Sequence, residues 1–162
     1  MFEVKRFQRW GLIVLIFLVI PPAFAAEPYE ASLGKVEGEV KVRSAQDGLW
    51  KPALKHMVLG EKDEILTALD SSAEILLEKK GGVGKVEMGE NTRLRLGTLE
   101  KRPETGDKKT LLELAIGRVL VLTKKLHGSS EFQVKTPTSS CGVHGTVFEV
   151  TVQKKQAPSA TS

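Results

Sequence analysis

The feature that most restricts the fold of this chain is an alternation of apolar and polar residues with a period of two. Phe132 and Val134 alternate with polar neighbours, and Phe148, Val150 and Val152 do the same after a connection rich in turn-forming residues. This period is typical of a β-strand with one buried face. Because no segment after residue 25 maintains the 3.6-residue apolar stripe of a confident helix, the sequence predicts an all-β protein.

The alternation, with glycines between the apolar runs, predicts a series of short antiparallel strands. The alternation is clearest at Ala73, Ile75 and Leu77, which would lie on one face of a strand. A helix could be argued for Leu111–Leu122, but Gly117 and the β-branched residues after it favour strands. Strands at such intervals fit a β-sandwich or a β-roll. The expected strands lie at residues 36–42, 64–67, 73–78, 86–88, 94–96, 111–114, 117–123, 132–134 and 146–152.

Three connections between these strands have the composition of turns or loops. Gly89-Glu90-Asn91 predicts a β-hairpin between its flanking strands. Gly81–Lys85 is glycine-rich like a phosphate-binding loop, but its spacing differs and a strand follows, which favours a hairpin turn. The polar segment Gly97–Lys109 is expected to form an exposed loop.

Residues 1–25 have the organisation of a cleavable export signal. Three basic residues precede the apolar run Gly11–Ile20, which would form a signal helix, and Ala23-Phe24-Ala25 supplies a small-x-small cleavage site. The run is shorter than the roughly 20 apolar residues of a transmembrane helix, and Pro21-Pro22 interrupts it. We therefore expect a periplasmic or otherwise exported protein that meets the membrane only before cleavage. An uncleaved membrane anchor is the alternative.

The remainder of the chain is expected to form one domain. We expect a linker at residues 26–33, the β domain at residues 34–152, and a disordered tail at residues 153–162, which has no large apolar residue. The formal net charge is +4, and because residues 1–25 contain three Lys or Arg and one Glu, the remainder has a charge of +2. Basic and acidic residues alternate along it, so no nucleic-acid partner is predicted.

No combination of residues points to catalysis, a cofactor or a metal. His56, His127 and His144 lack the short spacings that zinc ligands have. The serines that follow His127 are not part of a Gly-x-Ser-x-Gly elbow, so a hydrolase is not indicated. We predict a non-enzymatic protein without a cofactor or metal site.

Two residues have a structural and a functional interpretation. Cys141, the only cysteine, is either a buried small hydrophobe or an intermolecular disulfide partner, and the small residues beside it favour burial. Trp50 either covers one end of the core or stacks on a ligand, and core packing is favoured.

The stretch from Phe132 to Val152 resembles the closing motif of the FecR domain of bacterial envelope proteins. In that motif a strand leads into Thr-Pro, a bend of small residues and an Arg-Gly-Thr-x-Phe strand. The segments Leu59–Ala73 and Gly117–Val119 are similar to two earlier elements, so the resemblance covers roughly Gly34 to Val152. It implies a twisted, solenoid-like stack of hairpins. The residues of the closing motif that match are Thr136, Pro137, Gly145, Thr146 and Phe148, and His144 stands where the family usually has Arg.

The substitution at His144 leaves two interpretations open. The family Arg would hold backbone carbonyls or a carboxylate, whereas imidazole offers at most two donors and changes charge near neutral pH. A structural hydrogen bond across the bend is favoured. The alternative is that protonation of His144 tightens the closing hairpin.

The resemblance implies a module outside the cytoplasmic membrane. The best-known FecR domains relay the state of an outer-membrane receptor to a sigma-factor regulator that has a cytoplasmic region before its membrane helix. Only ten residues precede Gly11, so we expect a free-standing exported FecR-like domain that binds an envelope protein or glycan. A structural envelope protein that binds cell-wall polymer is the alternative. The partner, the signal and the oligomeric state are not indicated.

Overall fold

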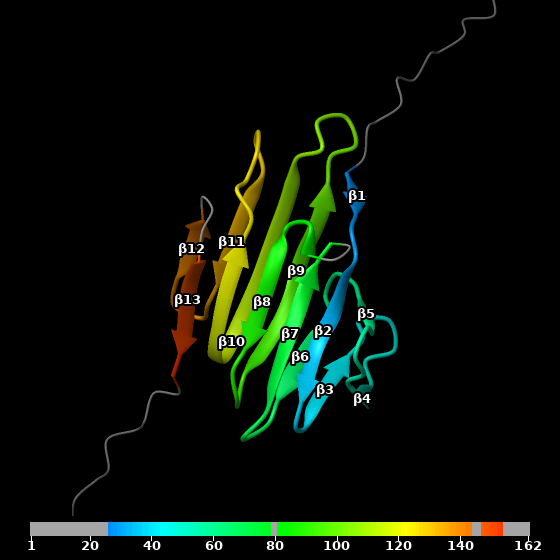
Figure 1. Cartoon of the computed structure of the whole chain (residues 1–162), viewed down its shortest axis with the longest axis vertical. Helices are drawn as coiled ribbons and strands as arrows, with labels where there is room; N and C mark the ends of the chain where they lie inside the picture. Colours follow the sequence, from blue (N-terminus) through cyan, green and yellow to red (C-terminus); the bar gives the residue numbers. More distant parts are fainter. Residues whose placement is uncertain (1–25, 79–80, 144–146, 154–162) are drawn as a thin grey trace, which may run out of the picture.

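The protein is built from β-strands, as seen in a computed structural model that describes residues 26–78, 81–143 and 147–153 (Figure 1). Among these residues, no helix is long and apolar enough to cross a membrane. The expected export signal, the expected tail beyond Gln153 and the motif residues His144, Gly145 and Thr146 lie outside the described residues. The prediction of an all-β fold is confirmed.

The described strands form one curled sheet whose members fall into two groups that share a strand. In chain order they are β1 (Glu27–Pro28), β2 (Ala31–Glu37), β3 (Val40–Arg43), β4 (Trp50–Pro52), β5 (Val58–Leu59), β6 (Glu64–Thr67), β7 (Ser72–Leu77), β8 (Gly84–Met88), β9 (Arg93–Lys101), β10 (Lys108–Thr123), β11 (Glu131–Lys135), β12 (Ser140–Val143) and β13 (Val147–Val152).

The first group has the order β4-β3-β6-β9-β10-β11-β12, with β1 beside the end of β9. The second has the order β5-β2-β7-β8-β10-β13. Residues 108–116 of β10 pair within the first group, and residues 117–123 pair with β8 and β13 in the second. All pairs are antiparallel except β10–β11, which is parallel. The long strand β10 therefore joins the two groups.

The inward faces of both groups meet in one apolar core. Ile65 and Leu94 come from the first group, Ile75 and Val86 come from the second, and all four are fully buried. In each strand the residues between these positions are at least partly exposed, as expected for the two-residue period. Burial of this apolar surface from distant parts of the sequence is the main source of stability.

Gly117 is the residue at which β10 passes from one group to the other. Its φ of 99° is a conformation that residues with a Cβ rarely adopt. A Cβ at this position would also lie 2.5 Å from Cα of Thr92. The next residue, Arg118, donates its backbone N–H to Oγ1 of Thr92 over 3.0 Å, which fixes the crossing point.

The structure confirms several strand predictions. Strand β6 has the predicted bounds, and β7 and β8 pair as a hairpin across the glycine-rich segment, whose last two residues, Gly84 and Lys85, already belong to β8. Other expectations were wrong. The sequence around Gly89–Asn91 forms a tight connection, but β8 and β9 do not pair with each other. They pair instead with members of different groups, so the chain crosses between the groups here.

Two segments that were expected to lack regular structure contain strands. The predicted linker at residues 26–33 forms β1 and the start of β2, because Tyr29, Ala31 and Leu33 alternate and are buried. The loop predicted at Gly97–Lys109 is confined to residues 102–107. Its polar composition concealed Leu99, which is fully buried and whose carbonyl accepts the N–H of Tyr29.

The last strands do not form the predicted hairpin across residues 136–145. The strand that contains Phe132 and Val134 pairs with β12, while β13 pairs with the second part of β10. Phe132 still contacts Phe148, with ring centroids 6.2 Å apart in an edge-to-face arrangement. The two halves of the motif are therefore joined through the core rather than through backbone pairing.

Candidate functional site

Five charged residues form a continuous row across the outer face of the first group. Residues that are directly opposite in adjacent strands follow one another from β3 to β11, and their charges alternate in sign. We call this set the charge row. It consists of Arg43, Glu64, Arg95, Glu113 and Lys135.

The row faces outward because the neighbours of its members in each strand face the core. Val42 and Ile65, for example, are buried beside Arg43 and Glu64. Opposite charges at directly opposed positions stabilise a sheet. Each pair is worth at most about 1 kcal/mol where it is exposed. The row therefore contributes modestly to stability and leaves most of its hydrogen-bonding capacity available.

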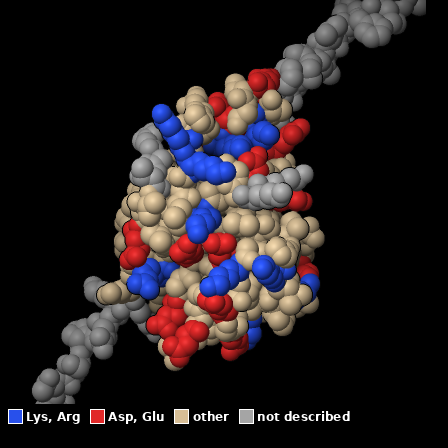
Figure 2. Space-filling model, viewed as in Figure 1, with Lys and Arg blue, Asp and Glu red and all other residues tan. Residues whose placement is uncertain are grey.

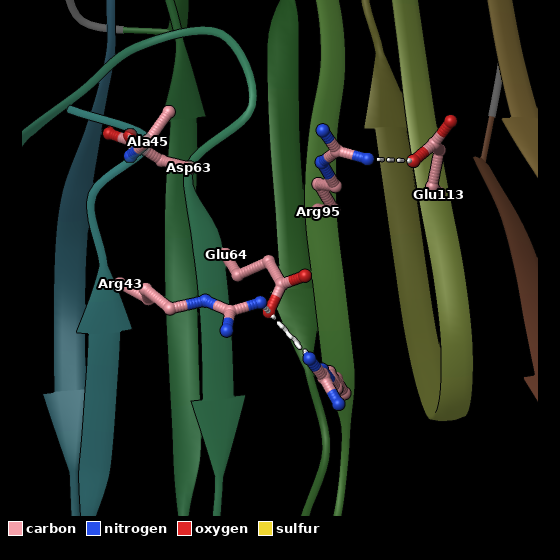
Figure 3. Close-up of polar contacts among 7 residues, drawn as sticks. Arg43, Ala45, Asp63, Glu64, Arg95 and Glu113 are labelled. Atoms are coloured by element: carbon pink, nitrogen blue, oxygen red, sulfur yellow. Dashed lines mark hydrogen bonds and ion pairs between the residues drawn. The ribbon is translucent and has the colours of Figure 1, made fainter. Parts of the chain in front are cut away.

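Glu64 is the centre of the ion pairs in this row (Figure 3). Its Oε2 accepts hydrogen bonds from Nη2 of Arg43 at 2.7 Å and from Nη2 of Arg93 at 2.8 Å. Its side chain is only 14% exposed, whereas those of the two arginines are 35% and 43% exposed. Farther along the row, Nη1 of Arg95 lies 3.4 Å from Oε2 of Glu113.

Trp50 extends the row by one strand. It lies opposite Arg43 in the β3–β4 pair. The guanidinium carbons of Arg43 and Arg93 lie 5.1 Å and 6.0 Å from the centroid of its ring, within the range of a cation–π contact. The indole is 37% exposed, so the expectation that Trp50 covers the core was wrong. Because β4 is an edge strand, Trp50 contacts the two arginines on the outer face and does not pack into the core.

Two hollows lie along this face. One, of about 400 Å³, is lined by Arg93, Arg95, Glu113 and Lys135 together with Thr136 and Pro137. The other, of about 410 Å³, is lined by Arg43 and Lys62 and by Ser44, Ala45 and Gly48 of the turn after β3, and the two hollows share Glu64 and Arg95. Together they present five cationic and two anionic side chains. The surface is therefore positive and suited to an acidic ligand.

Asp63 fixes the loops beside the charge row. Its carboxylate lies beside Ala45 (Figure 3) and accepts the backbone N–H of Ala45 at 2.8 Å. It also accepts the backbone N–H of Gly60 at 2.9 Å. Asp63 directly precedes β6, so its bond with Ala45 ties the turn at residues 44–48 to the start of that strand. At the end of β6, Thr67 donates its hydroxyl to the carbonyl of Gly89 at 2.6 Å.

The outer face of the second group has a larger hollow, of about 480 Å³, with a different charge balance. It is lined by Lys35, Arg118, Glu74, Glu87 and Glu149. Beside it, Lys85 forms ion pairs with both Glu74 and Glu87, on its own and the adjacent strand. The hydrogen bond with Glu87 is the main reason why the pKa of Lys85 is raised. Figure 2 shows basic and acidic side chains interspersed over the face in view.

The family-motif residues that the structure describes lie at one end of the charge row and in the core. Thr136 is nearly buried and closes the β11–β12 turn, since its Oγ1 accepts the N–H of Ser139 at 3.0 Å. Pro137 follows it in the wall of the 400 Å³ hollow. Phe148 is half-buried against Phe132. His144 lies outside the described residues, so both interpretations of its role stay predictions.

The remaining candidates are separate from this face. Cys141 is exposed on β12, so the prediction of its burial was wrong: among the described strands β12 pairs only with β11, and its side chains are largely exposed. The structure places His56 in the segment before β5 and His127 in the one before β11. Over the described part of the chain, no group of three or more His, Cys, Asp or Glu could hold a metal ion.

The charge row is not apparent from the sequence. Its members occupy the polar positions of alternating strands, which suggests an outward orientation for each of them. Their common alignment depends on pairing between strands far apart in the sequence, which alternation alone does not determine.

Comparison with protein-family models gives one match. The model described as FecR protein matches residues 63–161, which include every member of the charge row except Arg43. Comparison with curated proteins and with solved structures found no match.

Proposed function

The chain belongs to the FecR protein family, which indicates a function related to envelope signalling, and on that premise we propose that it is a non-enzymatic binding module. In this proposal the protein is exported by residues 1–25 and acts in the periplasm. It takes part in signalling through contacts with another envelope protein.

The observation that supports a binding role is the exposed surface formed by Trp50 and the charge row. Tryptophan and arginine are the side chains that most often dominate protein–protein interfaces. Here Trp50 and two arginines contact one another on the outside of the sheet and remain partly exposed. A guanidinium that is already held by Glu64 loses less side-chain entropy when it binds a partner.

Site-specific crosslinking in the cell that makes the protein tests this proposal. A photoreactive amino acid replaces Ala115, an exposed residue that lines the 400 Å³ hollow but is not part of the charge row, in one variant and Glu87, on the other outer face, in a control variant. We expect the first to crosslink to a discrete envelope protein in the periplasmic or membrane fraction, and the control to give no such product. Crosslinking from both positions to sedimenting cell-wall polymer would instead support the structural role and overturn the proposal.

A further inference from the structure

The cations of the charge row recur on every second strand. Arg43 lies on β3, Arg95 on β9 and Lys135 on β11, with one strand between each pair. Because adjacent strands are about 4.8 Å apart, successive cations are separated by about 9.6 Å along the row. A ligand that follows the row would meet a positive charge at this interval.

A polyproline II segment has a matching repeat. It has three residues per turn and rises about 3.1 Å per residue, so side chains at every third position lie on one face about 9.3 Å apart. An extended β-strand lacks this match, because its same-face residues are separated by multiples of about 6.7 Å. Proline-rich segments also bind to exposed aromatic rings, and Trp50 lies at one end of the row.

The cations have donors available for a ligand. Arg43 uses one of its nitrogen atoms for Glu64, and Arg95 makes one long contact with Glu113. A guanidinium has five N–H groups in all, so each arginine retains donors for a second carboxylate. Lys135 is exposed and has no ion pair among the described residues.

The charge of this face differs from that of the rest of the protein. The residues that line its two hollows have five cations and two carboxylates, a balance of +3. The chain from residue 26 has a charge of +2, so the remainder has a charge of −1. An acidic ligand is therefore attracted to this face in particular. Glu64 and Glu113, which lie between the cations, would repel a polymer whose negative charges are closely spaced.

From this spacing, the available donors and the charge balance, we infer that the charge row binds a proline-rich segment of a partner protein in the polyproline II conformation. The segment has a carboxylate at every third residue, and a proline ring packs on Trp50. This inference rests on the proposed function, because it names the class of partner that the module recognises.

Binding of synthetic peptides to the purified, processed protein tests the inference. The probe is a fluorescent peptide of four Pro-Pro-Glu repeats, measured by anisotropy at low salt. Two comparison peptides are four Pro-Pro-Gln repeats and a peptide of the same composition as the probe with its glutamates contiguous. We expect the probe to bind at least about tenfold more tightly than either, a difference that three exposed ion pairs can supply. Equal binding of the contiguous peptide would overturn the inference.

Variants connect the binding to the row. Lys135→Glu and Arg95→Glu should each weaken binding of the probe by about tenfold, because each removes an attraction and adds a repulsion. Arg118→Glu makes the same charge change on the other outer face and should alter binding less than about twofold. Lys135 is exposed, so its variant should fold normally, and thermal unfolding checks both row variants.

The two proposals can fail separately. If the probe does not bind but crosslinking from position 115 still captures an envelope protein, the polyproline inference is wrong and the proposed function stands. If the probe binds and no envelope protein is crosslinked, the row has the predicted chemistry and the proposed signalling role is wrong.

Discussion

Replacement of Gly117 by alanine should destabilise the protein more than the same replacement at Gly106 or Gly60. Two effects add at Gly117. The φ of 99° lies outside the regions that alanine adopts readily, at a cost of about 1–3 kcal/mol. A Cβ would also lie 2.5 Å from Cα and 2.7 Å from Cβ of Thr92, and overpacking of this kind costs about 1–3 kcal/mol.

The expected loss for Gly117→Ala is therefore about 2–6 kcal/mol in the free energy of unfolding. Small domains have a total stability of about 5–15 kcal/mol, so this is a large part of it. Thr92 cannot move away freely, because its Oγ1 accepts the N–H of Arg118 and its own N–H is donated to Oγ1 of Thr67. The clash is thus with a part of the backbone that is held on two sides.

Two further glycines separate the effects. Gly106 has a φ of 73°, and a Cβ added there would have nothing within 4 Å, so Gly106→Ala measures the conformational cost alone, about 1–2 kcal/mol. Gly60 has open space and no positive φ, so Gly60→Ala should leave stability unchanged or raise it by up to about 1 kcal/mol. Urea denaturation with linear extrapolation gives the three values. If Gly117→Ala costs no more than Gly106→Ala, the close approach to Thr92 does not constrain the crossing of β10.

Three other predictions concern buried or half-buried side chains. Burial raises the pKa of Tyr29 to about 12, so the stability that its neutral form provides is complete below about pH 10 and is lost as the pH rises to about 12. In the Tyr29→Phe variant this alkaline loss of stability should be smaller by about 2–3 kcal/mol. The measurement is the difference in free energy of unfolding between wild type and variant, compared at pH 9 and at pH 12. Phe132→Ala should cost about 3–5 kcal/mol in urea denaturation and Phe148→Ala less, because Phe132 is 1% exposed and Phe148 is half-buried. Glu64→Gln should cost about 1–3 kcal/mol because it leaves two arginines without their carboxylate, whereas Glu39→Gln, at an exposed pair, should cost clearly less; equal losses would contradict the role assigned to Glu64.

The positions of many strands could be predicted from the sequence because alternation is a local property. Ala73, Ile75 and Leu77 identify β7 without any knowledge of its partners, and all three are buried as expected. The same pattern at Tyr29, Ala31 and Leu33 is easily missed because the segment follows the expected export signal. Polar composition likewise conceals the end of β9, where one buried leucine among charged residues is sufficient to continue the strand.

Edge strands account for the errors at Trp50 and Cys141. Tryptophan and cysteine are usually buried, and that average favoured the core for both. The usual burial of a residue type takes no account of whether its strand lies at the edge or in the middle of a sheet. Because β4 and β12 each pair with one neighbour along the described chain, their side chains remain exposed. The hairpin predicted at Gly89–Asn91 failed for a related reason: the same turn residues suit two strands that pair and two strands that separate into different groups.

The charge row depends on one irregularity in a segment whose composition predicts a loop. In the β9–β10 pair, Thr98 lies opposite Leu111, but Leu96 lies opposite Leu112, so Gly97 is an extra residue in β9. If the register of Thr98 continued without this bulge, Arg95 would lie opposite Leu114, a buried residue, and the row would end at β9. A Cβ at Gly97 would lie 3.1 Å from the carbonyl oxygen of Leu111, which is tight enough to favour glycine. A single glycine therefore determines that Arg95 meets Glu113 and that the row continues to Lys135.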